Sequence, residues 1–186
     1  EGRKKAMQRR IWPIWVYYGI AVIAFLIDYA SKKIISRTVE LDTERISVIG
    51  DFFMITHIRN RGAAFGMLQE QRLFFIVITT IVVIGIIWYL HRSYRTGTVL
   101  LLSALATILG GAVGNFLDRA LYGEVVDFLQ FNFGSYTFPI FNFADTAIFV
   151  GVGMVILDAL LTMKQENKSN GNGEQSQDQS PEQPSV

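Results

Sequence analysis

The stretch from Gly110 to Asp145 reads GGAVGNFLDRALYGEVVDFLQFNFGSYTFPIFNFAD. It joins the end of one apolar segment to the start of the next through a short polar excursion that contains three aspartates, Asp118, Asp127 and Asp145. Two of them end the same pattern, Asn115-Phe-Leu-Asp118 and Asn142-Phe-Ala-Asp145, whose spacing would place each Asn and Asp on one face of a helix. Because ionisable groups beside hydrocarbon are energetically costly, they indicate a functional site.

The composition of the whole chain indicates a membrane protein. Of its 186 residues 51% are hydrophobic, and the mean hydropathy of +0.32 is too high for an ordinary soluble domain of this size. A net charge of +1 without an extended basic surface excludes nucleic-acid binding. The chain has no cysteine, so thiolate metal sites and a cysteine nucleophile are excluded as well.

Four apolar segments have about the 20 residues that a helix needs to cross a bilayer: Ile11–Ile27, Leu73–Leu90, Thr98 to about Leu117, and Ile140 to about Met163. The predicted fold class is therefore an α-helical membrane protein with four transmembrane helices. We interpret residues 1–6 as a cloning remnant and residues 7–163 as one four-span membrane domain. The polar residues 164–186 have nothing to bury and should form a disordered tail.

Basic residues beside the spans predict the orientation. Six of them fall on the side of both termini: Arg9, Arg10, Arg92, Arg95, Lys164 and Lys168. By the positive-inside rule this side is the cytoplasm, although the first loop is also rich in Lys and Arg. We therefore expect an N-in, C-in topology with a cytoplasmic tail and with the three aspartates at the outer membrane interface.

Two of the loops contain extended segments. In the first loop, Ile46–Ile49 and Phe52–His57 flank a Gly-Asp turn and indicate a hairpin. In the third loop, Val125–Phe131 and Tyr136–Phe138 form a second extended pair. Because both loops lie on the same side, we expect a small extracytoplasmic β-sheet that covers the aspartates.

The sequence context separates Asp145 from Asp118. Asp145 lies several residues inside an apolar span without a basic neighbour in the sequence, so a functional role is favoured. Asp118 is explained equally well as an interfacial residue that pairs with Arg119 or Lys32. Asp28 and Lys32 are spaced i, i+4 on the first helix, which favours a structural ion pair.

For Asp127, an ordinary place on an exposed strand is favoured by the sequence alone. Strand alternation would nevertheless put it on the same face as Val125 and Leu129, so it would face the membrane if they do. The glycines near the end of the third span indicate close helix packing: Gly110, Gly111 and Gly114. Such packing would bring this end of the helix near a neighbouring element.

Other hydrolytic chemistries lack their motifs. The chain has no His-Glu-x-x-His sequence and no Gly-x-Ser-x-Gly sequence. His57 and His91 belong to opposite ends of the predicted topology, so they cannot share a metal ion. What remains is a pair of carboxylates that activates water without a metal or another cofactor.

Five motifs occur in order along the four spans: Asp28-x-x-x-Lys32, Arg59-Asn-Arg-Gly-Ala-Ala-Phe65, Gly110–Arg119, Val125–Phe128 and Phe141–Asp145. With these motifs the chain resembles the bacterial lipoprotein signal peptidases, or signal peptidase II, over Ile11 to Met163. Tyr29 departs from the glutamine that the family usually carries after the first aspartate. The catalytic motifs are not affected by this change.

The resemblance implies an aspartic-type membrane endopeptidase of the bacterial cytoplasmic membrane. Such an enzyme removes the signal peptide of prolipoproteins on the N-terminal side of a diacylglyceryl-modified cysteine, at the outer face of the membrane. The implied partners are lipid-modified prolipoprotein signal peptides and membrane lipids, with no obligate protein partner. No cofactor is implied.

The resemblance also implies the site residues. It assigns the catalytic pair to Asp127 and Asp145. Residues that contact the substrate would be Asn60, Gly62, Asn115, Arg119 and Asn142. Supporting residues would be Asp28, Lys32 and Asp118.

Two other functions remain as alternatives. A small proton-coupled transporter or channel subunit would use the aspartates as a relay, and an inactive assembly factor would not need a matched carboxylate pair. A relay requires ionisable groups at several depths in the membrane, whereas the third span is apolar from Val99 to Leu109. The peptidase is therefore the favoured hypothesis.

Overall fold

The computed structural model describes residues 12–63 and 67–177. The predictions for residues 1–6, for Arg9 and Arg10, for the last two residues of the Arg59–Phe65 motif and for residues 178–186 lie outside these ranges. The elements in chain order are α1 (Ile14–Thr38), β1 (Arg45–Ile49), β2 (Phe53–Asn60), α2 (Arg72–Ser93), α3 (Val99–Tyr122), β3 (Val125–Phe133), β4 (Tyr136–Thr137) and α4 (Phe143–Gln177).

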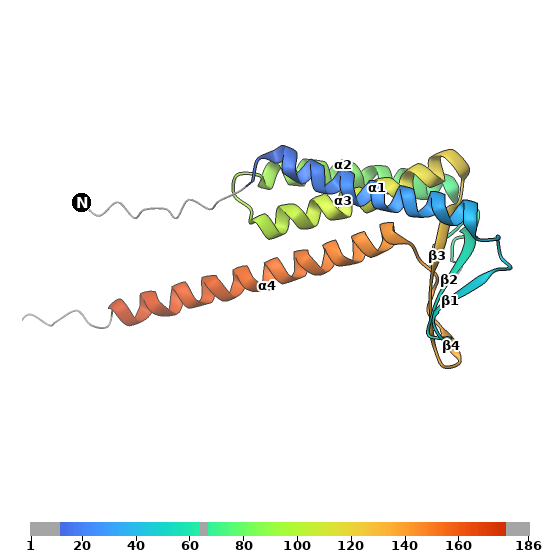
Figure 1. Cartoon of the computed structure of the whole chain (residues 1–186). Coiled ribbons are helices and arrows are strands. Elements are labelled where there is room, and N and C mark those ends of the chain that lie inside the picture. The colour runs from blue at the N-terminus through green and yellow to red at the C-terminus, as the bar shows by residue number, and fades with distance from the viewer. Residues whose placement is uncertain (1–11, 64–66, 178–186) are drawn as a thin grey trace, which may run out of the picture.

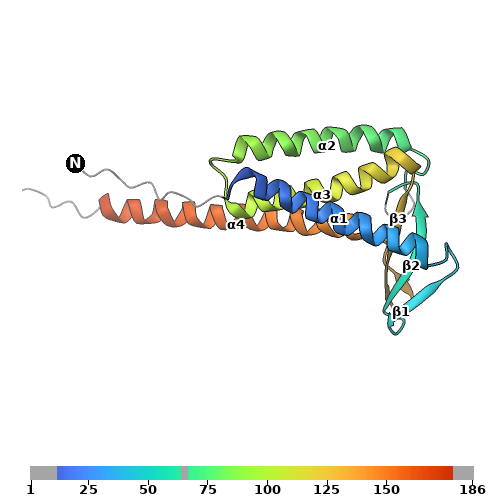
Figure 2. The same ribbon diagram turned by 45° about the horizontal axis from the view of Figure 1, so that its top comes forward.

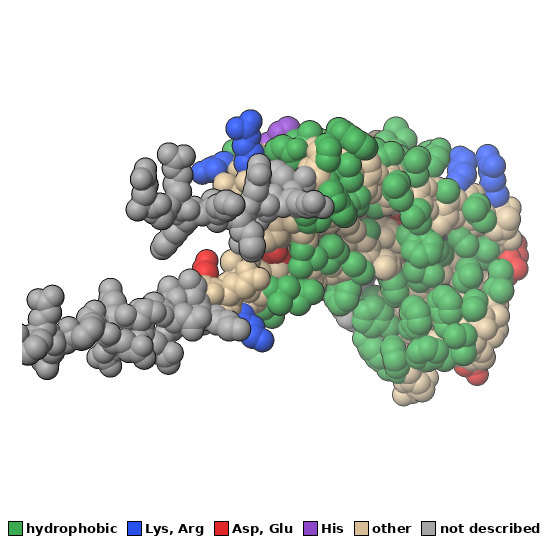
Figure 3. Space-filling view, turned by 60° about the vertical axis from the view of Figure 1, so that its left-hand side comes forward, with side chains coloured by type: hydrophobic (Ala, Val, Ile, Leu, Met, Phe, Trp, Pro, Cys, Tyr) green, Lys and Arg blue, Asp and Glu red, His purple; other side chains and the backbone are tan. Residues whose placement is uncertain are grey.

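All four helices are long and apolar enough to cross a membrane, as predicted. Helix α3 is the central one, since it packs against α1, α2 and α4 and is the most buried of the four (Figure 2). The outward faces of the other helices expose large apolar side chains, and Figure 3 shows hydrophobic side chains over most of one face of the molecule. Such a surface is expected for helices whose solvent is lipid.

Small residues let α3 approach its neighbours closely, as the sequence predicted. A Cβ atom added to Gly110 would overlap the backbone of Ala21 on α1, and one added to Gly111 would overlap the backbone of Ala144 on α4. At Gly114 the added atom would lie 2.5 Å from a carboxylate oxygen of Asp28. The polar end of α3 therefore contacts both α1 and the start of α4.

The four strands form one antiparallel sheet in the order β1-β2-β3-β4, so the predicted union of the first and third loops is confirmed. The sheet stands across one end of the helix bundle (Figure 1). Helix α1 starts, and α4 ends, at the opposite end. The arrangement agrees with the predicted small sheet over the aspartates, while the side of the membrane on which it lies stays a prediction.

Strand β2 is longer than predicted and contains a bulge. It runs to Asn60, three positions beyond the predicted end at His57, and so pairs Asn60 with Val125 at the start of β3. Its pairing with β3 shifts between Ile55, opposite Leu129, and Ile58, opposite Asp127. Such bulges redirect side chains and are common beside functional sites.

Helix α4 differs from the prediction at both ends. It begins at Phe143 because Phe141 is still extended and exchanges backbone hydrogen bonds with Leu129 of 2.8 and 3.2 Å. Asp145 is therefore the third residue of the helix, and the expectation that it lies several residues inside was wrong. At the other end, the helix continues to Gln177, whereas we expected disorder from residue 164. Extending a formed helix avoids the cost of nucleation, so polar residues can continue it.

Candidate active site

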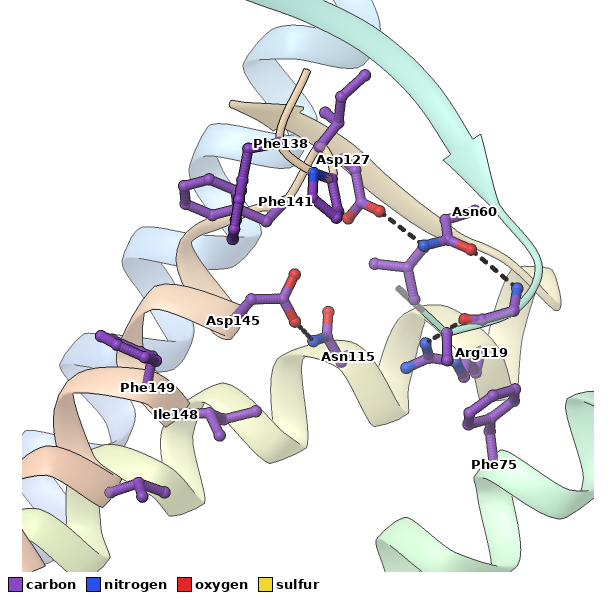
Figure 4. Close-up of a pocket in the computed structure, with 16 residues that line it drawn as sticks. Asn60, Phe75, Asn115, Arg119, Asp127, Phe138, Phe141, Asp145, Ile148 and Phe149 are labelled. Carbon is purple, nitrogen blue, oxygen red and sulfur yellow. Dashed lines mark hydrogen bonds between the residues drawn. The ribbon is translucent and has the colours of Figure 1, made fainter. Parts of the chain in front are cut away.

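Asp127 of β3 and Asp145 of α4 face the same cavity, which has a volume of about 610 Å³ (Figure 4). The cavity lies where the sheet meets the ends of α3 and α4. Its polar lining comes from Asn60, Gly62, Asn115, Arg119 and the two aspartates. Its apolar lining includes Phe75, Phe138, Phe141, Ile148, Phe149 and Val152.

The carboxylate of Asp127 is buried and held by two amides. Only 2% of the residue is exposed. Asn60 donates from Nδ2 to Oδ2 at 2.9 Å, and Asn142 donates from Nδ2 to Oδ1 at 2.7 Å. Burial, and next to it the negative charge of Asp145, raises the pKa of Asp127 to about 7, while the two amide donors oppose this rise. Asp127 can therefore hold or release a proton near neutral pH.

Asp145 is half-buried and belongs to a capping arrangement at the start of α4. The side chain of Asn142 accepts a hydrogen bond from the Asp145 backbone N–H at 2.9 Å, and Asp145 Oδ2 accepts one from the Asn142 N–H at 3.3 Å. This reciprocal pair is a capping box with Asn and Asp as its members. The other oxygen, Oδ1, accepts a hydrogen bond from Asn115 Nδ2 at 2.7 Å.

Gly62 and Arg119 form one wall of the cavity. Arg119 donates from Nη2 to the carbonyl oxygen of Gly62 at 3.1 Å, and its guanidinium lies 4.6 Å from the centre of the Phe75 ring. The backbone N–H of Gly62 donates to Asn60 Oδ1 at 2.9 Å. A Cβ atom at Gly62 would overlap the carbonyl oxygen of Met67, so this wall has no space for a larger residue.

Asp28, Lys32 and Asp118 form a buried cluster behind the cavity. The Lys32 ammonium lies 2.8 Å from a carboxylate oxygen of Asp28 and 2.8 Å from one of Asp118, so the predicted ion pair is confirmed. It also donates to Asn115 Oδ1 at 2.9 Å. Asp28 Oδ1 in turn accepts a hydrogen bond from the backbone N–H of Ala144 at 2.8 Å, which ties α1 to the start of α4.

The predicted site residues therefore meet in one place, but in two layers. The two aspartates and four of the five predicted contact residues line the cavity, and Asn142 joins them through hydrogen bonds. Asp118 borders a separate cavity of about 180 Å³ together with Lys32. This separation favours Asp127 over Asp118 as the partner of Asp145.

Strand alternation predicted the direction of Asp127 only in part. Val125 and Asp127 both line the cavity, as expected. Leu129 does not line it and packs instead against the apolar cluster of Ile35, Val39 and Phe128. The face that holds the aspartate is therefore short.

Sequence reasoning missed the apolar lining of the cavity. On α4, Ile148, Phe149 and Val152 follow Asp145 at i+3, i+4 and i+7, which is the spacing of one helix face. That spacing would have found them. Phe75 and Phe138 lie on other elements, and no local pattern connects them to the aspartates.

The two histidines are separated in the structure. His57 lies in the sheet, where its Nδ1 is 2.9 Å from the carbonyl oxygen of Val39. His91 lies near the end of α2, 2.8 Å from the hydroxyl of Tyr18. Within residues 12–63 and 67–166, no three His, Cys, Asp or Glu side chains are placed to bind a metal ion together.

Comparisons with known proteins identify the family of the chain. A family model described as Signal peptidase (SPase) II matches residues 20–161. A lipoprotein signal peptidase of Brevibacillus brevis is 50% identical over 148 residues, which cover 80% of this chain and 97% of the relative. That of Bacillus subtilis is 43% identical over 153 residues, covering 82% and 98%.

Solved structures extend the agreement to the fold. One bacterial membrane enzyme, 33% identical, has a TM-score of 0.73 and covers 96% of this chain and 99% of its own. A second, 37% identical, has a TM-score of 0.70 and covers 83% and 97%. The family match and these identities, together with the aspartates at the end of a four-helix membrane bundle, show that the chain belongs to the signal peptidase II family.

Proposed function

We propose that Asp127 and Asp145 form the catalytic pair with which this aspartic membrane peptidase removes signal peptides from prolipoproteins. One observation carries the assignment: two carboxylates from different elements face one cavity, and among the described residues their hydrogen-bond partners are amides rather than cations. The cut lies on the N-terminal side of the diacylglyceryl-modified cysteine.

The pair works with one shared proton. Two carboxylates about 4 Å apart repel by roughly 4 kcal/mol at an effective dielectric constant near 20, so double ionisation is disfavoured. Asp127, with its pKa of about 7, carries this proton, and Asp145 is the ionised member. Asp145 then takes a proton from water while Asp127 donates its own to the oxygen of the scissile carbonyl.

The bonds balance without a metal ion or another reactant. The water oxygen bonds to the carbonyl carbon, and the tetrahedral intermediate collapses with cleavage of the carbon–nitrogen bond. Asp145 returns its proton to the leaving amino group of the modified cysteine, and Asp127 regains a proton from a hydroxyl group of the gem-diol intermediate as the carbonyl of the product acid forms. The asparagine amides hold both carboxylates in place without adding a positive charge that would lower their basicity.

The cavity wall and its apolar lining suit the two parts of the substrate. Gly62, Arg119 and Asn60 present backbone and side-chain polar groups along which an extended peptide can lie. Phe149 is 81% exposed on the outer surface of α4, so the apolar lining is continuous with the lipid-facing surface. The acyl chains of the modified cysteine occupy this apolar part.

The orientation is N-in and C-in, with the sheet and the site at the outer face of the cytoplasmic membrane. The basic loop between α2 and α3, with Arg92 and Arg95, supports it. Because the chain has no cysteine, single cysteines test it directly. In intact cells a membrane-impermeant maleimide should label Ser135→Cys, in the turn between β3 and β4, and spare Thr96→Cys until the membrane is opened. The reverse pattern would overturn the orientation.

The catalytic pair is tested with Asp127→Asn and Asp145→Asn on a lipid-modified precursor. Each variant should insert normally and lose cleavage by about 10³-fold or more, because the substitution keeps the volume and removes ionisation. Asp51→Asn, in the exposed turn between β1 and β2, is the matched control and should cleave normally. Near wild-type cleavage by either site variant, or loss of wild-type activity in EDTA, would overturn the assignment.

A further inference from the structure

Three asparagines share one arrangement around the catalytic pair. Each donates from Nδ2 to an aspartate: Asn60 and Asn142 to Asp127, and Asn115 to Asp145. Each also turns Oδ1 toward a group that can only donate hydrogen bonds. For Asn60 this group is the backbone N–H of Gly62, and for Asn142 it is the backbone N–H of Asp145.

For Asn115 two side chains donate to Oδ1: the ammonium of Lys32 at 2.9 Å and Nδ2 of Asn142 at 3.3 Å. Only the ammonium is an obligate donor, because an asparagine amide can also present its oxygen. An amide can rotate by half a turn and exchange its oxygen with its nitrogen at little intrinsic cost. In the rotated state Oδ1 of Asn115 would face a carboxylate oxygen of Asp145, and both atoms are acceptors. A partner that can only donate excludes this state, because it requires the oxygen on its own side.

We propose that Lys32 is a positioning residue of the reaction: its ammonium fixes the amide of Asn115 in the orientation that donates to Asp145. The proposal rests on the proposed function, in which Asp145 is the ionised member of the pair. Lys32 is 4% exposed and does not line the cavity, and the Asn115 amide is the hydrogen-bonded link between its ammonium and Asp145.

The partners of Lys32 agree with this role. Its ammonium lies 2.8 Å from one carboxylate oxygen each of Asp28 and Asp118, as ion pairs, and it donates a hydrogen bond to Asn115 Oδ1 at 2.9 Å. The two carboxylates compensate the buried charge and leave one donor for the amide. An ion pair that served stability alone would need one carboxylate and no asparagine of the site.

Steady-state kinetics of Lys32→Met on a lipid-modified precursor test the proposal, normalised to folded enzyme by size-exclusion chromatography. We expect kcat to fall by about 10²-fold, because small losses of alignment at a reacting group cost this much. KM should stay within about twofold, since Lys32 does not contact the cavity. Lys33→Met is the matched control, because Lys33 is exposed and has no ion pair within the described residues; its kinetics should equal those of wild type.

A second variant separates positioning from folding. Lys32→Met alone leaves Asp28 and Asp118 buried without a cation, which destabilises strongly. Combining Lys32→Met with Asp28→Asn and Asp118→Asn removes all three charges and should restore the melting temperature while kcat stays about 10²-fold low. Recovery of kcat together with stability would show a structural role only and would overturn the proposal.

The outcomes also separate this inference from the proposed function. Wild-type kcat in folded Lys32→Met, with Asp145→Asn inactive, would overturn the role of Lys32 and leave the catalytic pair intact. Normal cleavage by Asp145→Asn would instead contradict the catalytic pair itself. The role of Lys32 and the catalytic pair would both be supported if kcat fell without a change in KM in the two variants that contain Lys32→Met, while Lys33→Met kept wild-type kinetics.

Discussion

The chain contains the same four-residue pattern twice, and the two copies have different roles. Asn115-Phe-Leu-Asp118 lies within α3, where a helical turn separates Asn and Asp. Asn142-Phe-Ala-Asp145 straddles the start of α4, so Asn142 precedes the helix and Asp145 is its third residue. The local sequence is nearly identical, and only the position relative to the helix end differs.

This difference in position decides how each aspartate is compensated. Asp118 lies 2.8 Å from the Lys32 ammonium, a cation that it shares with Asp28. Asp145 instead lies at the N-terminus of a helix, where unpaired backbone N–H groups favour a negative charge without neutralising it. Its hydrogen-bond donors are an asparagine amide and a backbone N–H. A carboxylate held by neutral donors stays available for proton transfer, whereas the cation beside an ion-paired carboxylate stabilises its charge and makes it a weaker base.

The largest expected effect is the difference in cleavage rate between variants of the two aspartates, Asp145 and Asp118. Asp145→Asn should lower kcat by about 10³-fold or more, because a general base is lost. Asp118→Asn should cost less than about tenfold, since Lys32 keeps Asp28 and Asn115 as partners. The measurement is single-turnover cleavage of a lipid-modified precursor by both variants in the same membranes.

The same experiment can reverse the assignment. If Asp118→Asn lost all cleavage activity and Asp127→Asn cleaved at the wild-type rate, Asp118 and Asp145 would be the catalytic pair. The two Asn-x-x-Asp units would then have equivalent chemical roles. The present structure opposes that outcome, because Asp118 borders a different cavity from Asp145.

The next effect concerns Asp127, which belongs to neither unit and depends on Asn142 of the second. Its pKa rises on folding from 3.8 to about 7, so the folded state binds the proton more tightly than the unfolded chain. The contribution of the Asp127 carboxyl to stability is therefore fully present below about pH 4, is lost as the pH rises from about 4 to 7, and does not change further above that range. At one pKa unit per 1.36 kcal/mol, the total loss is on the order of 4 kcal/mol.

Asp127→Asn should remove this penalty. In detergent, the variant should melt at a higher temperature than wild type at pH 8, and the advantage should shrink as the pH is lowered toward 4. Asp51→Asn serves again as the exposed control and should follow wild type at each pH. An advantage that did not change with pH would mean that the carboxyl of Asp127 is not protonated preferentially in the folded state.

Much of this architecture was predictable from the sequence because it depends on composition and spacing. Lipid requires apolar segments of a fixed length, so the four spans were visible, and the i, i+4 pair of Asp28 and Lys32 follows from helix geometry. The union of the two loops in one sheet followed from the topology. Each of these inferences uses a rule that is local or set by the bilayer.

The rest depended on contacts between distant elements. The start of α4 was predicted at Ile140, because no local rule shows that Phe141 pairs with Leu129 of β3. The environment of Asp127 could not be predicted either. It depends on the pairing of β3 with the bulged strand β2 and on the hydrogen bond from Asn60 at the end of that strand. The family resemblance, rather than the pattern of residues, selected Asp127 as the partner of Asp145.

The smallest expected effect compares the two asparagines. Asn142→Ala removes the side chain that caps α4, which costs about 1 kcal/mol, and also a donor to Asp127. Asn115→Ala removes a partner of Lys32, but alanine is a better helix former inside α3 and offsets part of the loss. Asn142→Ala should therefore lower the free energy of unfolding by about 1 kcal/mol more than Asn115→Ala. Equal melting temperatures would show that the capping position of the second unit does not distinguish it energetically from the first. Asn60→Ala, which loses a donor to Asp127 but no helix cap, separates the two contributions and should fall between the other variants.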